Sequence, residues 1–499
     1  MVYCGPLSKA CLPCRRRKLR CDLRTDACTQ CTRAQLTCSG YRDTTALRFR
    51  HETNAVQQRV TARKSTTTIP RSPPLSIYCQ ARDIFYHNYV FGPSKPFEFL
   101  LSVYSQTSKD VHLSRSVDAV ALAYLNAQRP SGSAELEARR SYVSALQYTS
   151  RALQEPHLAK QDSTILAILL LDLYEKITTR APAFHGAWAT HLDGALALVK
   201  LRGDEQFIEP SIRGMLIRLS TNVLISCVTS RRPVLDDLVS LRHTIAAHSL
   251  TPPDPKWRES DLVIEFAKLR HNIDTRVLAD ENEVTFALIE LDSKFLELSR
   301  QVPPTWQYVT IQVATKSIHH YESHHHIHPA EHVCQMWNTF RATRILLNEL
   351  VRSRCMDRQG RVNAGSGFQG IHERATRAIK QMATDICASL PQYIHGPSTF
   401  DLTGSPSASS DLGSGTFPAG RPDPRYHLPC YRLIYPLFVA AQSSVVPPSL
   451  SKWVVDQLRF MADYHAIKNA MTVANLLESG QRTDVGKVYA MLGSYAFVC

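Results

Sequence analysis

The sequence predicts a mainly α-helical protein in which a small cysteine-rich domain precedes a large helical domain. Two observations lead to this prediction. Half of the 14 cysteines fall within the first 38 residues. From residue 75 onward, apolar residues recur at alternating four- and three-residue spacing, which is the period of an amphipathic helix. With 499 residues and 44% hydrophobic side chains, the chain is long enough to form more than one core.

The helical signal is clearest in four apolar stripes. One follows Asp280, a predicted N-cap, and consists of Val284, Leu288, Leu291, Phe295 and Leu298. Another lies in residues 331–351 and consists of Val333, Met336, Trp337, Phe340, Leu347 and Leu350. Residues 164–177 and 453–471 carry the other two, and "ILAILLL" (165–171) is expected to form a buried helix. No series of alternating strands joined by hairpin turns is predicted.

Composition divides the chain into three parts. We predict a cysteine-rich domain over residues 1–43, a flexible linker over 44–74 and a helical domain over 75–499. The linker is expected because "ARKSTTTIPRSPP" (62–74) is polar and ends in prolines. A stretch around 396–424, rich in Gly, Ser and Pro, predicts a disordered insertion between helices.

No strong coiled coil is expected after the cysteine-rich domain. A zipper needs several heptads of apolar residues, and this part of the chain offers only Leu47, Val56 and Val60. Action as a monomer and homodimerisation through the large domain therefore both stay open.

Positive charge is concentrated at the N-terminus. The formal net charge is +14, and residues 1–71 hold 15 of the 58 lysines and arginines but only four of the 44 acidic residues. The rest of the chain is nearly neutral. A basic N-terminal part on a near-neutral body predicts a polyanionic partner for that part alone.

We expect an intracellular chain with no membrane partner. "MVYCGPLSKA" lacks the apolar core of a secretory signal, and no apolar run of 18 residues is evident. Because disulfides are disfavoured inside the cell, clustered cysteines there favour a metal.

The N-terminal cysteines form an internal repeat. Apart from Cys4, they read C-x2-C-x6-C twice, separated by six residues, and consist of Cys11, Cys14, Cys21, Cys28, Cys31 and Cys38. Zinc prefers four tetrahedral ligands, so one ion would leave two cysteines over. Two ions need eight ligations from six sulfurs, so two thiolates must bridge, one equivalent cysteine from each half. A single zinc ion and three disulfides are the alternatives.

The two halves differ in charge. "RRRKLR" (15–20) in the first half has five basic residues, whereas the matching "TRAQLT" (32–37) has only Arg33. Each segment is expected to form a short helix after its C-x2-C pair. Lysine and arginine donate to guanine N7 and O6 in the major groove, so the first half is the one equipped to meet double-stranded DNA. The same segment could serve for nuclear import.

These features resemble the fungal zinc binuclear cluster (Zn2Cys6) family of transcription factors. The cysteine spacing and the flanks "MVYCG" and "GYRD" (40–43) are similar to one large subset of that family, although "DLRTDA" (22–27) lacks the proline that many members carry. The body resembles the helical fungal-specific regulatory domain of the same subset, through "WATHLDGALALVKLRG" (188–203) and "WNTFRATRILL" (337–347).

The resemblance implies a function and a set of site residues. It implies a nuclear, sequence-specific RNA polymerase II transcription factor that reads CGG-type triplets and is not an enzyme. Two zinc ions would be bridged by Cys11 and Cys28. The lysine four positions after the second cysteine, which reads the triplet in the family, is Lys18, with Arg17 beside it. Contacts to phosphate position a protein on DNA without reading its sequence. The better candidates for such contacts are Arg15, Arg16, Arg20 and Lys9. A small-molecule effector of the helical domain is a further implication.

Two other functions compete with this interpretation. "HPAEH" (328–332) matches the H-x-x-E-H pattern of a zinc-dependent hydrolase, in which His328 and His332 would bind the metal and Glu331 would act as base. Against it, Pro329 fits only the first turn of a helix. The second alternative is a chromatin or partner scaffold that carries the zinc cluster.

Overall fold

The computed structural model divides the chain into two compact units, Met1–Pro74 and Leu75–Cys499. The residues that the structure describes are 8–43, 75–92, 95–107, 110–178, 185–359, 366–395, 427–465 and 467–492. The expected linker (44–74) and disordered insertion (396–424) lie outside these ranges, as do the residues considered for a coiled coil.

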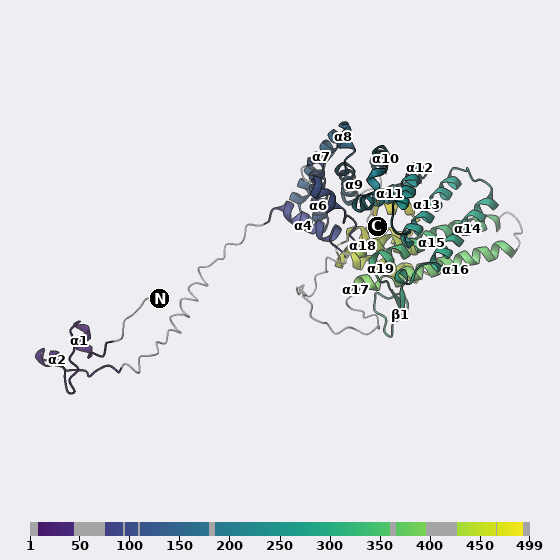
Figure 1. The fold of residues 1–499 in the computed structure, drawn as a ribbon. Coiled ribbons are helices and arrows are strands. Elements are labelled where there is room, and N and C mark those ends of the chain that lie inside the picture. The colour runs from purple at the N-terminus through teal and green to yellow at the C-terminus, as the bar shows by residue number, and fades with distance from the viewer. Residues whose placement is uncertain are drawn as a thin grey trace. The chain divides into compact units, whose positions relative to one another are not determined.

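Residues 8–43, the described part of the first unit, contain two short helices and no apolar core other than the cysteines. The helices are α1 (Leu12–Arg16) and α2 (Thr29–Arg33) (Figure 1). Cys11, Cys14, Cys28 and Cys31 are its fully buried apolar residues, with Ala10 and Tyr41 packed beside them. So small a core does not hold a fold together alone, and metal is the usual substitute.

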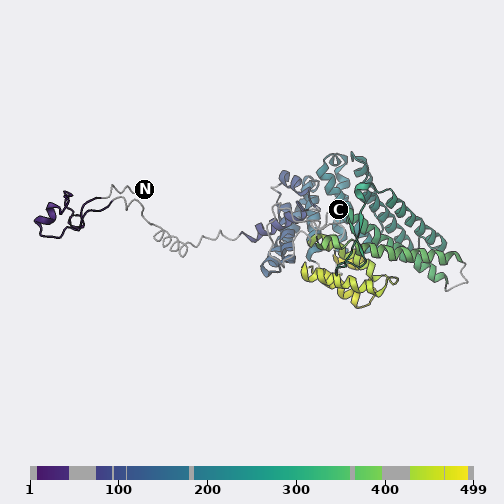
Figure 2. The same ribbon diagram turned by 90° about the horizontal axis from the view of Figure 1, so that it is seen from below.

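The second unit is helical almost throughout, as predicted (Figures 1 and 2). Its first half consists of α4 (Ile77–Tyr89), α5 (Leu100–Thr107), α6 (Val111–Gln128), α7 (Gly132–Gln154), α8 (Pro156–Ala159), α9 (Asp162–Thr178), α10 (His185–Arg202), the 3-10 turn η2 (Asp204–Phe207), α11 (Pro210–Ser230) and α12 (Asp236–Ala247). Its second half consists of α13 (Pro255–Asp274), α14 (Glu281–Arg300), the 3-10 turn η3 (Pro304–Trp306), β1 (Val309–Gln312), β2 (His324–Ile327), α15 (Glu331–Gln359), α16 (Ser366–Ala388), α17 (Pro391–His395), α18 (His427–Gln442), α19 (Pro448–Tyr464), α20 (Lys468–Glu478) and α21 (Val485–Leu492).

The predicted apolar stripes form the packing faces of these helices. In α14 all five stripe residues are buried, and Asp280 caps the helix by accepting from the amides of Asn282 and Glu283 at 2.8 and 2.9 Å. The stripe of α15 is buried from Val333 to Leu347 and half-buried at Leu350. "ILAILLL" lies inside α9 and is buried, as expected. The predicted stripe 453–471 is interrupted, because α19 ends at Tyr464 and α20 begins at Lys468.

Two apolar clusters divide the helical unit. The larger is built mainly from α4, α6, α9, α11, α18 and α19, and the smaller from α13, α14 and α15. In the smaller cluster α15 packs against α14 on one side and α16 on the other (Figure 1). Arg344 of α15 stabilises the contact with α14 by donating to both carboxylate oxygens of Asp292 at 2.8 and 3.0 Å.

One described helix, α11, is long and apolar enough to cross a membrane by length and composition alone. Of its most apolar window, 72% is buried inside the helical unit, a pattern that the core helix of a soluble protein also gives.

As expected, the described residues contain no series of alternating strands, although one short pair occurs that was not predicted. Strands β1 and β2 form an antiparallel pair in which Val309 lies opposite Ile327 and Gln312 opposite His324. The sequence hid this hairpin because β1 is largely exposed and β2 is almost entirely histidine. The residues between the strands dock on α19, where His319 Nδ1 lies 2.7 Å from Gln457 Oε1.

Two buried histidines, His326 of β2 and His328 just beyond it, are held neutral inside the protein. Arg341 of α15 donates to His326 Nδ1 at 3.2 Å, and His328 Nδ1 donates to Gln392 Oε1 at 3.2 Å. Burial, reinforced by the Arg341 charge, lowers the pKa of His326 to about 2 and the pKa of His328 to about 3. Protonation of either ring would therefore oppose the fold.

This predicts that acid destabilises the helical unit partly through His326. Below about pH 6.5 the unfolded chain binds a proton at this ring and the folded chain does not, so stability falls by about 1.4 kcal/mol per pH unit for the one imidazole. We expect His326→Gln to lose less stability than the wild type between pH 6.5 and 5. Denaturant unfolding followed by tryptophan fluorescence reports on the helical unit alone, because all five tryptophans lie in it. The exposed His157 offers a control, since His157→Gln should keep the wild-type slope. Equal slopes for all three proteins would contradict the account.

Candidate metal centre and nucleic-acid interface

Each short helix of the first unit begins directly after a cysteine. Cys11 is the N-cap residue of α1 and Cys28 the N-cap residue of α2. Both adopt extended backbone, and the helix that follows contains the second cysteine of its pair, Cys14 or Cys31. The sequence placed each helix after the C-x2-C pair, and that was wrong. Because the turn starts at the first cysteine, both sulfurs of a pair lie on one side of the same helical turn.

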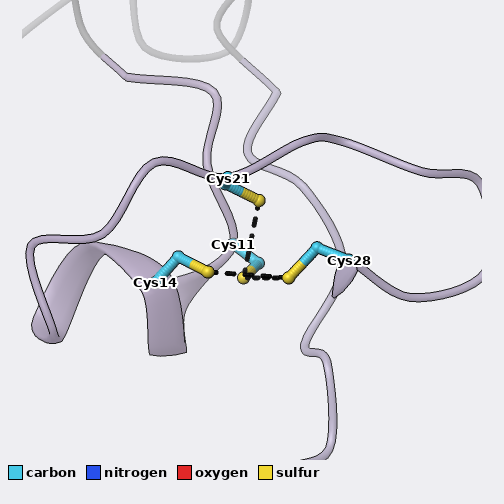
Figure 3. A group of neighbouring side chains, drawn as sticks. All are labelled: Cys11, Cys14, Cys21 and Cys28. Carbon is cyan, nitrogen blue, oxygen red and sulfur yellow. Dashed lines mark hydrogen bonds between the residues drawn. The ribbon is translucent and has the colours of Figure 1, made fainter. Parts of the chain in front are cut away.

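The six cysteines form two groups of four that share two members. One group is Cys11, Cys14, Cys21 and Cys28, and the other is Cys11, Cys28, Cys31 and Cys38. Within each group all sulfurs lie within 4.8 Å of one another. The sulfur of Cys11 lies 3.6 Å from those of Cys28 and Cys31 and 3.9 Å from that of Cys21, and the Cys14 and Cys28 sulfurs are 3.5 Å apart (Figure 3).

These distances fit zinc. Four sulfurs around one zinc at about 2.3 Å form a tetrahedron with edges of about 3.8 Å. The measured separations of 3.5 to 3.9 Å match such an edge. The donor set is also what zinc prefers, since every member of both groups is a cysteine.

The protonation of these thiols is coupled to metal binding. Burial raises the pKa of Cys11 and Cys14 and raises that of Cys31 to about 12. Hydrogen bonds from the backbone at Cys28 and Gly40 lower the pKa of Cys38 to about 7. Without a metal most of these groups keep their protons at neutral pH. A bound dication displaces the protons and removes the repulsion between neighbouring thiolates.

The two halves are related by a local pseudo-symmetry that extends beyond the sulfurs. Lys18 and Gln35 each follow their helix in a left-handed conformation, with φ of 52° and 53°. The amide of Lys18 donates to the carbonyl of Arg15 at 3.2 Å, and the amide of Gln35 donates to that of Thr32 at 3.1 Å. The backbone thus presents Lys18 and Gln35 in the same way.

Each half also caps the helix of the other. Asp22, which follows Cys21, accepts from the amide of Thr29, the first residue of α2, at 3.1 Å, and from the Thr29 hydroxyl. Ser39, which follows Cys38, accepts from the amide of Leu12, the first residue of α1, at 3.3 Å. The Thr29 hydrogen bond is also the main cause that lowers the pKa of Asp22. These reciprocal contacts fix the two helices to one another.

The basic residues predicted to meet DNA all belong to the first half or its flank. Arg15 and Arg16 lie in α1, Arg17 is its C-cap residue, and Lys18 follows in the left-handed position. Arg20 lies in the extended segment beyond, and the carbonyl of Lys9 accepts from the amide of Arg42 at 3.2 Å.

These six cations are largely uncompensated. All are exposed except the half-buried Arg15, whose Nε is buried with no hydrogen-bond partner within the described part of the chain. In residues 8–43 the one ion pair joins Arg24 and Asp22 at 3.4 Å, and none of the six takes part in it.

The rival hydrolase site does not assemble. His328 lies beyond β2 and is bonded to Gln392, Glu331 forms an ion pair with Arg432, and His332 packs against Trp306. The histidines and the glutamate of "HPAEH" thus have other partners.

A different group of metal-ligand types occurs nearby, at His324, His326 and Asp385. The ligand atoms of these three residues lie within 4.8 Å of one another. Because Arg341 donates to Nδ1 of His326, the neutral ring carries its proton on Nε2 and offers a donor there.

The fold and the site together define a zinc-cluster protein with a large helical domain. Residues 9–47 match the fungal Zn(2)-Cys(6) binuclear cluster domain, and residues 76–276 match the fungal specific transcription factor domain. The chain thus carries segments of two families, and both are families of transcription factor domains rather than of enzymes. No curated protein and no solved structure matches it significantly. The helices continue past the second match, to Leu492.

Sequence reasoning missed the residues that join the two halves. Asp22 and Ser39 occupy the position after the third cysteine in each repeat, and this equivalence is visible in the sequence as two oxygen-bearing side chains in register. What the sequence could not reveal is that each side chain reaches the opposite helix. Tyr41 was missed as well, and its hydroxyl donates to the carbonyl of Arg24.

We predict that Asp22→Ala loosens the metal centre. The substitution removes the acceptor of the first amide of α2, so zinc should pass to a competing chelator several-fold faster than from the wild type. A chromogenic chelator measures this rate in the full-length protein. Asp26→Ala is the matched control, because Asp26 is an exposed acid of the same loop and its loss changes the net charge equally. If both variants release zinc equally fast, charge and not capping would be the cause.

Proposed function

We propose that the protein is a sequence-specific DNA-binding regulator of RNA polymerase II transcription that reads CGG-type triplets in the major groove. One observation carries this proposal. Two halves with the same backbone present Lys18 at one position and Gln35 at its equivalent, so the frame is symmetric while its charge is not. The first half concentrates five cationic donors for guanine N7 and O6 in residues 15–20, whereas the matching segment of the second half has Arg33 alone.

The metal centre would hold two zinc ions, with Cys11 and Cys28 as the bridging ligands. This assignment is supported by the two four-sulfur groups, which have those two residues in common. The remaining ligands would be Cys14 and Cys21 for one ion and Cys31 and Cys38 for the other. Zinc supplies folding energy there, since a unit of this size buries little else. Six thiolates and two zinc ions leave a net charge of about −2, which offsets part of the surrounding positive charge.

The basic residues would divide into two roles. Lys18 and Arg17 lie at the C-terminal end of α1 and would read base edges. Phosphate contacts are assigned to Arg15, Arg16, Arg20 and Lys9, which add affinity without sequence information. This division is what the family resemblance implies, and the place of Lys18, at a left-handed turn directly after α1, supports it.

A regulator of this kind acts in the nucleus, and "RRRKLR" (15–20) would also serve for import. The near-neutral helical unit would carry control and homodimerisation, because the basic charge is confined to the N-terminal part. Neither the hydrolase nor the scaffold alternative gains support from a specific contact.

The test compares variants of equivalent positions on two DNA duplexes. We expect Lys18→Gln, which copies the second half, to lose about 1–3 kcal/mol of discrimination between a CGG site and a scrambled site. Arg15→Ala should weaken binding to both duplexes evenly and reduce the slope of log affinity against log salt by roughly one. Fluorescence anisotropy with the full-length protein at several salt concentrations measures both effects.

Gln35→Ala is the internal control, because Gln35 shares the backbone of Lys18 but not its charge. It should leave the CGG preference unchanged. If Lys18→Gln and Arg15→Ala each lose affinity equally on both duplexes, the division into reading and positioning residues is contradicted. If Gln35→Ala loses the CGG preference, the assignment of reading to the first half is contradicted.

A further inference from the structure

The helical unit contains a cavity of about 520 Å³ that no part of the DNA-binding account uses. The cavity lies among α11, α12, α13 and α15. Its wall joins the two apolar clusters, since Leu224 and Ile245 belong to the larger cluster and Phe266 belongs to the smaller cluster. Pockets of roughly 300–1,000 Å³ are the usual size for small-molecule sites. A well-packed interior rarely leaves so large a volume unfilled.

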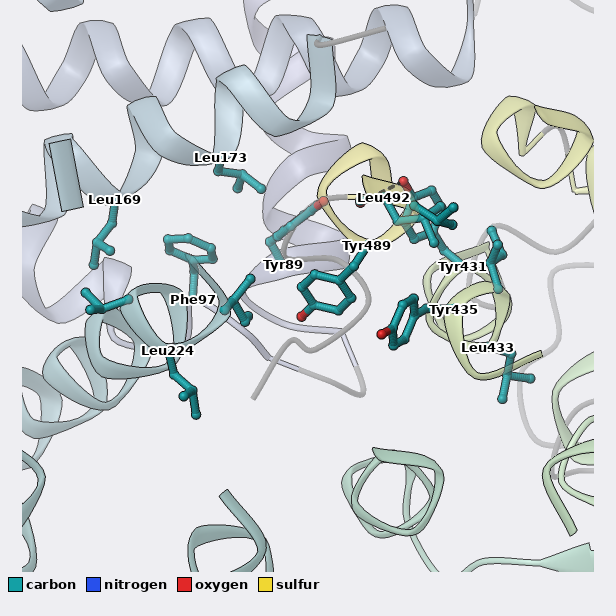
Figure 4. Close-up of a cluster of buried hydrophobic side chains, with 14 of the residues drawn as sticks. Tyr89, Phe97, Leu169, Leu173, Leu224, Tyr431, Leu433, Tyr435, Tyr489 and Leu492 are labelled. Atoms are coloured by element: carbon teal, nitrogen blue, oxygen red, sulfur yellow. Dashed lines mark hydrogen bonds between the residues drawn. The ribbon is translucent and has the colours of Figure 1, made fainter. Parts of the chain in front are cut away.

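Most of the wall is apolar. α11 contributes Leu224 and Val228, α18 contributes Tyr435 and α21 contributes Tyr489. The rings of Tyr435 and Tyr489 pack edge to face with centroids 4.7 Å apart, and Figure 4 shows both in the cluster of buried apolar side chains that also contains Leu224. A wall of this kind accepts an aromatic or branched apolar body.

One end of the cavity is different and offers hydrogen-bond donors. Lys256, in the first turn of α13, donates from Nζ to Gln335 Oε1 at 2.9 Å. This bond fixes the amide of Gln335, so its NH₂ group is left as a donor. Gln335 is only 8% exposed, and its Nε2 has no hydrogen-bond partner among the described residues. An unsatisfied buried donor beside a cavity is costly unless a ligand accepts from it.

The helix termini also favour a hydrogen-bond acceptor at this end of the cavity. Lys256 and Gln335 lie near the N-termini of α13 and α15, where the helix dipoles are positive. Two acids also lie at these termini, but Asp254 accepts from the amide of Trp257 at 2.7 Å and Glu331 is paired with Arg432.

The other charged groups of the wall do not favour an anion or a cation. Arg218 and Glu259 are both buried and contribute one charge of each sign. Arg242 is compensated by Asp261 at 2.7 Å, and Lys95 and Glu98 at the exposed rim oppose each other in sign. At the end of the cavity near the N-termini of α13 and α15, the charged and amide donors open to a ligand are therefore those of Lys256 and Gln335.

From this arrangement we infer that the cavity binds a largely apolar small molecule that ends in an oxygen acceptor, best a carboxylate. The apolar body lies between α11 and the Tyr435–Tyr489 pair, and the carboxylate accepts from Lys256 Nζ and Gln335 Nε2. Because the ligand contacts both apolar clusters, it stabilises their packing against each other and raises the stability of the helical unit. The site is independent of whether the cysteine cluster reads CGG.

Two dyes with the same kind of body and different charge provide the test. The anionic probe is 1-anilinonaphthalene-8-sulfonate, and the neutral probe is N-phenyl-1-naphthylamine. With the full-length protein we expect saturable fluorescence at one anionic probe per chain, with affinity at least roughly tenfold above that for the neutral probe. Lys256→Met should weaken the anionic probe by roughly tenfold and leave the neutral probe unchanged. Aromatic carboxylates should displace the anionic probe better than their amides do.

Matched variants separate the cavity from the surface. Val228→Trp fills the cavity and should abolish binding of both probes, whereas Val277→Trp places the same ring at a site that is 76% exposed and should change nothing. Lys468→Met is the control for charge, since Lys468 is an exposed lysine in the first turn of α20. Thermal melts verify that each variant is folded. If Val228→Trp does not fold, the comparison of Lys256→Met with Lys468→Met still decides the test. Binding that is unsaturable, equal for the two probes, or unaffected by both Val228→Trp and Lys256→Met would overturn the inference.

Discussion

The structure of the first unit depends on the sharing of the Cys11 and Cys28 sulfurs, which lie 3.6 Å apart and belong to both four-sulfur groups. Thiolates this close together repel one another unless a cation lies between them. Since residues 8–43 have almost no other core, metal–sulfur bonds at these cysteines would both pair the two halves and hold the start of each helix. The capping contacts of Asp22 and Ser39 then fix each helix to the other half.

On this symmetric frame the charge is free to differ. Lys18 and Gln35 share φ near 52° and the same pattern of amide bonds, so their side chains leave equivalent points of the backbone. The first half carries five basic residues in 15–20, and the matching segment of the second half carries Arg33 alone. Under the proposed function, specificity would change by substitution at Lys18 on an unchanged backbone frame. The helical unit is arranged for a different task, because its main cavity lies between two apolar clusters remote in sequence from the cysteines.

The sequence predicted what local spacing determines. The cysteine repeat gave the ligand pattern, and the apolar period gave α14 with its Asp280 cap, because both depend on residues close along the chain. The β1–β2 hairpin was missed because its strands carry no alternation, and His326 is buried through a contact with Arg341 on α15. The start of each short helix was placed too late. The cross-caps and the cavity could not be predicted, since their residues meet only through tertiary packing.

Zinc K-edge X-ray absorption, combined with zinc analysis, on the full-length protein tests the central claim most directly, because it reports the ligands of the metal and any neighbouring metal. The account predicts two zinc ions per chain, each surrounded by four sulfurs at about 2.3 Å with no nitrogen ligand, and a metal–metal contribution from the shared thiolates. In Cys28→Ser both the metal–metal contribution and the all-sulfur coordination of each ion should be lost. One zinc ion per chain, or a mixed nitrogen and sulfur shell in the wild type, would contradict it.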